Sequence, residues 1–98
     1  MSIDIPSSLK LRVTTPDKLL VDQEVKEVYI PGLDGYLGIF PGHRPLFVIL
    51  GKGDISFRRA HKEVKICVQG GYAEVFPDKV IVLAEVNKNE SRESNEGR

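Results

Sequence analysis

Short runs in which apolar and polar residues alternate make up most of residues 9–86 of this chain. Leu9, Leu11 and Val13 alternate with charged and polar neighbours, and Ile55 and Phe57 do the same further along. Successive side chains on a β-strand point to opposite faces, so this spacing predicts strands with one buried face. No window of eleven residues keeps uninterrupted helical spacing, and turn-forming residues close each run. The pattern predicts an all-β fold, either a sandwich or a barrel.

The same pattern places the individual strands. They are expected at residues 9–14, 27–30, 37–40, 46–50, 55–58, 63–68, 72–76 and 80–86, with a short apolar stretch at 19–21. Val25 is out of phase with the run that follows it, which indicates a bulge or a change of partner strand near Lys26. The uninterrupted apolar run at 46–50 predicts a strand covered on both faces. Gly70-Gly71 predicts a sharp corner or a close approach of two backbones.

Length and composition restrict the chain to one small domain. Its 98 residues are 41% hydrophobic, which suffices for one sheet-on-sheet core. The 14 basic and 14 acidic residues cancel, which argues against nucleic-acid binding and against a polybasic membrane anchor. The single cysteine, Cys67, fits a reducing compartment. Because residues 1–8 lack a signal-peptide pattern and no apolar run exceeds five residues, we expect a soluble cytoplasmic domain.

The last twelve residues differ in composition from the rest of the chain. Residues 87–98 include no apolar residue except Gly97, and half of their positions are charged. Such a segment buries too little surface to offset the entropy lost on ordering. We therefore expect a β-sandwich over residues 9–86, between a flexible N-terminus at 1–8 and a disordered polar tail at 87–98.

The sequence contains no recognisable pattern of nucleophile, base or metal ligand. Cys67 is expected on a strand between two apolar residues, where it is interpreted as an ordinary structural cysteine. His43 and His61 fall in a Gly/Pro-rich loop and in a hairpin tip, and their spacing from Cys67 matches no zinc site. The four glycines between positions 32 and 42 are not followed by the lysine and helix of a phosphate-binding loop. We predict no catalytic residue, no cofactor and no metal.

A local cluster of basic residues is expected at a hairpin. It consists of Arg58, Arg59, His61, Lys62 and Lys65. Exposed hairpin tips often carry solvated charge, so two interpretations stay open, an ordinary solvated tip and a contact site for a partner.

The segment 31–46 has the strongest features of an interaction surface. It is rich in glycine and proline, yet it carries large side chains, namely Leu33, Tyr36, Phe40, His43 and Arg44. Loops held on a rigid scaffold often bind partners, and aromatic and arginine side chains dominate protein interfaces. For Leu33 and Phe40 an alternative stays open, in which the loop folds back on its own core. The segment predicts a protein that works by docking against other proteins.

Two blocks of sequence have a further meaning when taken together, GYLGIFPGHRPL at residues 35–46 and VQGGYAEV at residues 68–75. They resemble signature segments of the epsilon subunit of F-type ATP synthases. The segments at 11–17, 25–30, 53–55 and 80–84 are similar to the same family in register, so the resemblance covers about residues 9–85. Either block alone is a weak signal, but both at this spacing are specific.

The resemblance implies a flattened β-sandwich of about ten strands in the central stalk of a rotary ATP synthase. It implies a non-catalytic rotor subunit that binds the gamma subunit and the c-ring, and acts indirectly on the alpha/beta catalytic hexamer. Such a subunit helps to couple proton or sodium translocation to ATP synthesis or hydrolysis. The implied location is peripheral, on the cytoplasmic side of the bacterial inner membrane, with no direct lipid insertion.

The resemblance also implies candidate contact residues. Leu33, Tyr36, His43 and Arg44 are implied to face the c-ring, with His43 at the same end as Tyr36. Thr15, His43 and Val48 are implied to face gamma.

Two departures from the family pattern bear on these expectations. Tyr36 stands where the family often has a carboxylate, so a charged contact with a basic c-ring loop is not expected through this residue. The family usually continues into a C-terminal helical hairpin, whereas residues 87–98 are polar and short. No inhibitory or ATP-sensing role is therefore assigned. Two other classes of protein remain as alternatives, a free-standing sandwich that binds a peptide or small ligand and a small hydrolase using Cys67.

Overall fold

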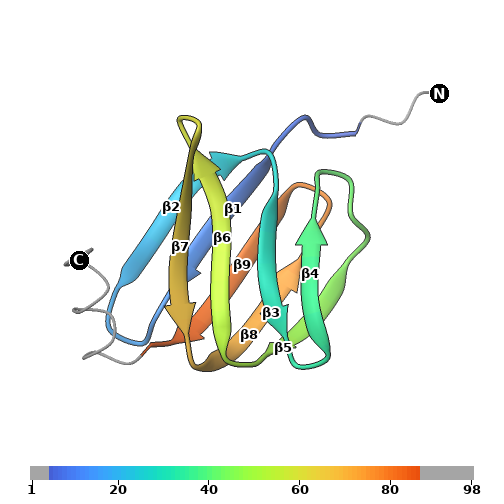
Figure 1. The fold of residues 1–98 in the computed structure, drawn as a ribbon. Coiled ribbons are helices and arrows are strands. Elements are labelled where there is room, and N and C mark those ends of the chain that lie inside the picture. Colours follow the sequence, from blue (N-terminus) through green and yellow to red (C-terminus); the bar gives the residue numbers. More distant parts are fainter. Residues whose placement is uncertain (1–4, 87–98) are drawn as a thin grey trace.

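The computed structural model describes residues 5–86, which form nine β-strands and no helix (Figure 1). The strands are β1 (Leu9–Thr14), β2 (Leu19–Val25), β3 (Val28–Gly32), β4 (Gly35–Ile39), β5 (Leu46–Leu50), β6 (Gly53–Arg59), β7 (Lys62–Val68), β8 (Gly70–Val75) and β9 (Lys79–Glu85). The predicted all-β fold is confirmed, with nine strands where about ten were expected. The predicted tail at 87–98 lies outside the described residues, as do the first four residues of the predicted flexible N-terminus.

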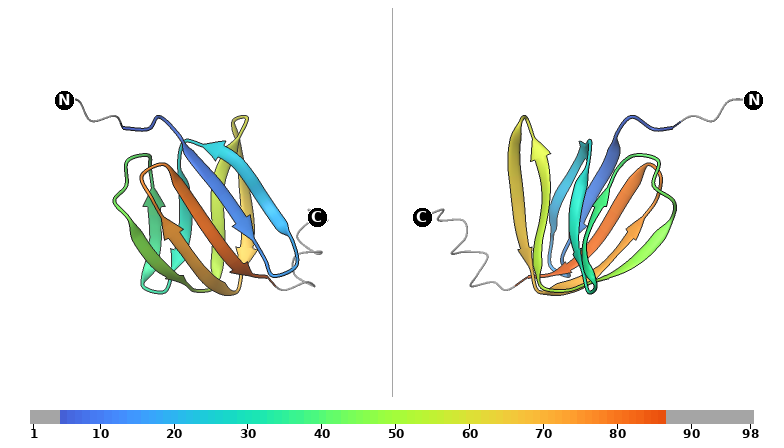
Figure 2. Two further views of the ribbon diagram at one scale, coloured as in Figure 1. Left: turned by 180° about the vertical axis from the view of Figure 1, so that it is seen from behind. Right: turned by 45° about the vertical axis from the view of Figure 1, so that its right-hand side comes forward.

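The strands form one continuous sheet that curls into two layers (Figures 1 and 2). One layer has the order β2-β1-β9-β8-β5, and the other consists of β3, β6 and β7 with β4 beside β3. The layers join where β5 meets β3 through a single residue pair, Gly32 and Leu50. Neighbouring strands are antiparallel except β1 and β9, which are parallel. Of the two predicted architectures, the sandwich is therefore the one observed.

Successive strands run in opposite directions, so their connections fall at two opposite ends of the sandwich (Figure 1). The connections β1–β2, β3–β4, β5–β6 and β7–β8 lie at one end, called the lower end below. The connections β2–β3, β4–β5, β6–β7 and β8–β9 lie at the other, called the upper end. A residue's place in the chain thus decides which end it occupies.

The irregular spacing near Lys26 has a simple structural cause. β2 ends at Val25 and pairs with β1, whereas β3 begins at Val28 and pairs with β4, β5 and β6. The chain crosses from one layer to the other between these strands. Of the two predicted explanations, the change of partner strand is correct.

Gly71 brings two backbones together, as its sequence context predicted. It lies within β8 opposite Ala84 of β9, and its φ of +122° is in a region that side chains rarely adopt. A Cβ atom at this position would collide with the backbone carbonyl of Leu83. The backbone approach is confirmed, and it occurs inside the sheet.

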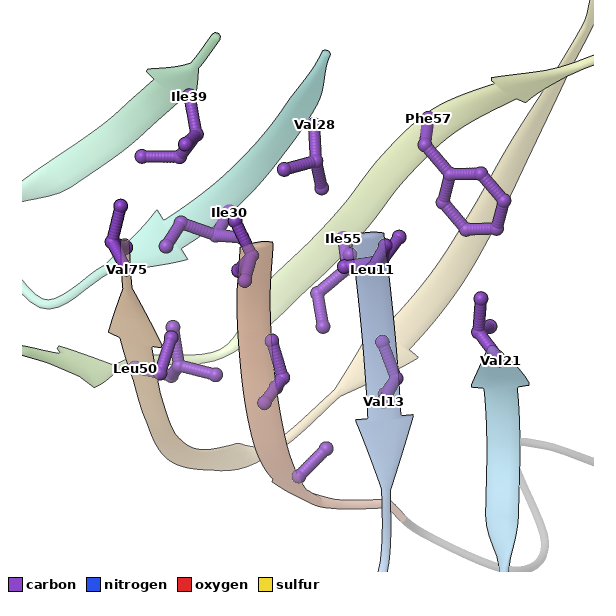
Figure 3. Packing of buried hydrophobic residues seen from close by; sticks show 14 of the residues in the cluster. Leu11, Val13, Val21, Val28, Ile30, Ile39, Leu50, Ile55, Phe57 and Val75 are labelled. Atoms are coloured by element: carbon purple, nitrogen blue, oxygen red, sulfur yellow. The ribbon is translucent and has the colours of Figure 1, made fainter. Parts of the chain in front are cut away.

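The core is a layer of aliphatic side chains between the two halves of the sheet (Figure 3). Phe57, Ile30 and Ile39 face inward from one layer, toward Leu11, Val75 and their neighbours in the other. No buried side chain among the described residues is polar or charged. Each of these larger side chains contributes about 1.5–3 kcal/mol by leaving water, so the alternation read from the sequence is what holds the layers together.

Candidate interaction surfaces

Leu33 and Tyr36 lie at the lower end, at the β3–β4 turn. Their side chains are 68% and 60% exposed. The turn is held in place by hydrogen bonds from the Leu33 N–H to the Ile49 carbonyl (3.0 Å) and from the Gly51 N–H to the Pro31 carbonyl (2.8 Å). The two large side chains therefore project from a fixed backbone. For Leu33, the alternative in which the loop folds back on the core is not what the structure shows.

The Tyr36 hydroxyl is used within the protein. It accepts a hydrogen bond from the backbone N–H of Asp54 (2.9 Å), at the start of β6. The phenol lies so close to Gly53 that a Cβ atom there would not fit. Tyr36 thus ties the β3–β4 turn to the β5–β6 turn, while much of its ring remains open to a partner.

His43 and Arg44 lie at the upper end, in the loop between β4 and β5. The Gly42 N–H donates to the Pro77 carbonyl at the β8–β9 turn (2.8 Å), and the His43 N–H donates to the Phe40 carbonyl (3.2 Å). The His43 Nδ1–H donates to the Arg44 carbonyl (2.7 Å). Strand β4 separates this loop from Tyr36. The expectation that His43 and Arg44 share one end with Leu33 and Tyr36 is wrong.

Phe40 belongs to the upper-end loop as well. Its ring meets the Tyr29 ring edge to face, with 6.2 Å between centroids, on the outside of β3 and β4. Its side chain is partly exposed. Phe40 therefore packs on a neighbouring ring at the surface and is not part of the core.

Thr15 closes the β1–β2 turn at the lower end. Its Oγ1 accepts hydrogen bonds from the N–H groups of Asp17 (3.2 Å) and Lys18 (3.1 Å), and its own N–H donates to the Lys18 carbonyl (2.8 Å). The hydroxyl is therefore engaged in the turn, and any partner contact here involves the exposed turn as a whole.

The side chain of Val48 faces the core and is only 8% exposed. Its neighbours on β5, Phe47 and Ile49, point outward and are 56% and 48% exposed. The prediction that β5 is covered on both faces is thus wrong for the chain by itself. The inner face is buried by the sandwich, and the outer face carries large apolar side chains in contact with water.

These outward residues form part of a larger apolar surface. Tyr72 of β8 lies opposite Ile49 and is 40% exposed, and its ring lies 5.3 Å from the Phe47 ring, centroid to centroid. In β9, Ile81 and Leu83 lie opposite Glu74 and Tyr72 and are half-buried. We call this surface the outer apolar face, and define it by Phe47, Ile49, Tyr72, Ile81 and Leu83. The exposed Glu74 lies among these residues, opposite both Phe47 and Ile81, so the face is apolar around one carboxylate. Apolar side chains gathered on one exposed face are typical of a protein interface.

The sequence analysis did not name any residue of the outer apolar face. A signal was available, because β5 is apolar at five successive positions and β9 at five as well. Such a run is typical of a strand covered on both faces, but within residues 5–86 the two layers of the sandwich cover only the inner face of β5. In this part of the chain, Phe47 and Ile49 on the outer face of β5 stay about half exposed.

The metal-ligating side chains of the described residues are scattered over the fold. Within residues 5–86, no three His, Cys, Asp or Glu side chains gather where they would hold a metal ion. Cys67 is half-buried on β7. The same part of the chain contains no helix of the length and hydropathy needed to cross a membrane.

The sequence of this chain matches that of a known protein family. The family described as "ATP synthase, Delta/Epsilon chain, beta-sandwich domain" matches residues 8–89. The chain belongs to this family. The resemblance seen in the two sequence blocks is therefore confirmed.

Curated relatives of this Delta/Epsilon sandwich domain are bacterial proteins named ATP synthase epsilon chain. The one from Solibacter usitatus is 44% identical over 82 residues, and the one from Moorella thermoacetica is 40% identical over 80 residues. These matches cover 84% and 81% of this chain but 61% and 60% of the two relatives. The chain thus spans less than two thirds of the length of these relatives.

Two solved structures share the fold of the Delta/Epsilon sandwich domain. A chain in the Euglena gracilis mitochondrial ATP synthase, described as OSCP/F1/c-ring, matches 99% of this chain with a TM-score of 0.77 and 20% identity. That match covers 67% of the Euglena chain. A chain in the central stalk and c-ring structure of the Tetrahymena thermophila mitochondrial ATP synthase matches 79% of this chain, and 63% of its own length, with a TM-score of 0.67 and 16% identity.

Proposed function

We propose that this chain is a non-catalytic subunit of the central stalk of an F-type ATP synthase, where it joins the gamma subunit to the c-ring. It would turn with both as part of the rotor, and so help to couple proton or sodium translocation to ATP synthesis or hydrolysis in the alpha/beta hexamer. Membership in the Delta/Epsilon family supports this role. The observation that carries it is the outer apolar face, because that face needs a protein partner.

The outer apolar face is the proposed contact with gamma. Phe47 and Tyr72 form a tilted pair of aromatic rings and Ile49 lies beside them, and aromatic residues of this kind are enriched at the centres of protein interfaces. Val48 contributes to this contact by fixing the strand, since its own side chain is inside the core. Thr15 at the lower end and His43 at the upper end are proposed as further contacts with gamma.

The lower end is the proposed contact with the c-ring. Leu33 and Tyr36 project there from a hydrogen-bonded turn. The proposed contact is mainly apolar and aromatic, with the Tyr36 hydroxyl, which accepts a hydrogen bond from the Asp54 N–H, still able to donate its own hydrogen. His43 and Arg44 are left out of it, since they lie at the upper end. The proposed location is the cytoplasmic side of the membrane, with attachment through the ring and gamma and without lipid insertion.

The contact with gamma is tested by comparing two surface variants. Tagged gamma from the same organism is incubated with wild-type chain, with Phe47→Asp and with Lys65→Asp, and the bound fraction is measured. A charge at Phe47 is expected to weaken binding by more than about tenfold, because it must lose its water inside an apolar contact. Lys65 lies on the outside of the other layer, so Lys65→Asp is expected to bind within about twofold of wild type. Thermal unfolding checks that both proteins are folded. If they are, equal binding of Phe47→Asp and wild type would remove the outer apolar face from the proposal.

A further inference from the structure

The segment from Arg58 to Lys65 carries a local excess of positive charge in a chain whose net charge is zero. Within eight residues it has four cationic side chains, Arg58, Arg59, Lys62 and Lys65, and one carboxylate, Glu63. All five are exposed. The excess of three positive charges is therefore presented to solvent, and we call these five residues the basic hairpin.

The basic hairpin is a rigid projection at the upper end of the sandwich. It is formed by β6 and β7, which pair in register from Gly53 with Val68 to Arg59 with Lys62. Figure 1 shows the tip rising above the other strands, and the right-hand view of Figure 2 shows the hairpin standing at one side of the molecule. A partner can approach the tip without displacing the rest of the fold.

One arginine of the basic hairpin is held in place by the domain itself. The Arg59 Nε–H donates to Gln23 Oε1 of β2 (2.8 Å), and the guanidinium lies 5.8 Å from the centroid of the Phe57 ring. By contrast, none of the other three cations forms an ion pair with a carboxylate of residues 5–86. The ion pair found in that part of the chain is between Arg12 and Asp22. Arg58, Lys62 and Lys65 are therefore available to an outside anion.

The turn of the basic hairpin has an unusual sequence for its shape. Ala60 and His61 have φ angles of 51° and 72°, the left-handed region at both central positions of a two-residue turn. Asn-Gly is the residue pair that fits this turn with least strain. Non-glycine residues in this region cost about 1–2 kcal/mol, and strain of this kind is often retained at functional sites. The exposed cations therefore sit on a backbone that the sequence has not optimised for stability.

We propose that the basic hairpin is a docking site for an acidic segment of a protein partner. Charge complementarity favours carboxylates as the ligand. Glu63 lies directly opposite Arg58 and shares the outward face of the hairpin with Arg58 and Lys65. Arg59 and Lys62 lie on the other face, so the positive charges are separated and do not form a continuous cationic track. That arrangement suits spaced carboxylates on a polypeptide better than the closely spaced phosphates of a nucleic acid or an anionic lipid surface.

This site is independent of the proposed function. The basic hairpin belongs to the layer that does not carry the outer apolar face, and to the end opposite Leu33 and Tyr36. Loss of its charges is expected to leave gamma binding within about twofold of wild type. The failure of one proposal is therefore distinguishable from the failure of the other.

The experiment uses a peptide of ten glutamates as the probe and the isotope-labelled 98-residue chain as the protein. Amide shifts are followed by NMR during titration at low and physiological salt. Saturable shifts are expected at residues 58–65, and weaker binding at higher salt. In the double variant Arg58→Gln and Lys62→Gln, affinity is expected to fall about tenfold.

Two control variants make the test specific. The double variant Lys18→Gln and Lys52→Gln also removes two positive charges, but at the lower end. Its affinity for the glutamate peptide is expected to change less than about twofold. Ala60→Asn with His61→Gly keeps all four cations on a relaxed turn and is expected to retain binding. Shifts spread equally over the lysines of both ends, or equal effects of the two charge-removing variants, would overturn the proposal. Tighter binding of duplex DNA or phosphatidylglycerol vesicles at the same residues would overturn the choice of a protein partner.

Discussion

Gly35 and Gly71 both have a positive φ angle but differ in their surroundings. Their φ angles are +134° and +122°, so each strains an ordinary side chain. A Cβ atom at Gly35 would meet nothing within 4 Å, whereas one at Gly71 would collide with the backbone of Leu83. The two positions therefore separate the cost of backbone strain from the cost of a clash.

The matched substitutions Gly35→Ala and Gly71→Ala measure that difference. Gly35→Ala is expected to lower the free energy of unfolding by about 1–3 kcal/mol, from strain alone. Gly71→Ala is expected to cost about 1–3 kcal/mol more, because β8 and β9 must also move apart. Urea unfolding of both variants checks the order. Equal losses would mean that the sheet accommodates the methyl group at Gly71.

The β6–β7 turn provides a second prediction for single residues. Replacing Ala60 by Asn and His61 by Gly relieves strain at both positive φ angles. We expect the free energy of unfolding to rise by about 0.5–1 kcal/mol in the same urea experiment. A decrease would show that the side chains of Ala60 and His61 stabilise the turn through contacts.

At the scale of the element, β5 shows what local patterns can and cannot predict. The approximate positions of most strands, the β6–β7 hairpin and the close approach at Gly71 follow from neighbouring residues and were predicted. The full length of β2, which extends to Val25, was not. The exposure of the outer face of β5 cannot be predicted from neighbouring residues. An apolar run has the same sequence pattern whether its second face is covered by the same chain or by another. Phe47 and Ile49 were missed for that reason.

Neighbouring substitutions on β5 test which face is inside. Val48→Ala removes methyl groups from the core and is expected to cost about 1–3 kcal/mol of unfolding free energy. Phe47→Ala removes a ring that is more than half exposed (56%), so the expected loss is under about 1 kcal/mol. Thermal or urea unfolding of the isolated chain compares the two. A larger loss for Phe47→Ala would reverse the assignment of the faces.

At the scale of the whole molecule, the residues of the segment 31–46 are divided between the two ends of the sandwich. The sequence of residues 31–46 is that of a glycine- and proline-rich loop, but the five residues of β4 lie within it. Extended chain rises about 3.3 Å per residue, so roughly 17 Å separate the two turns. Leu33 and Tyr36 therefore lie at one end and His43 and Arg44 at the other, which only the pairing of β4 with β3 determines.

The central claim is that the chain joins gamma through the outer apolar face, and calorimetric titration of the purified chain with its own organism's gamma subunit tests it most directly. We predict one-to-one binding with a dissociation constant below about 1 µM, and a negative change in heat capacity from buried apolar surface. No heat of binding to a folded gamma subunit at two well-separated temperatures would contradict the account. The molecule would then be a sandwich that uses its apolar face for a different partner.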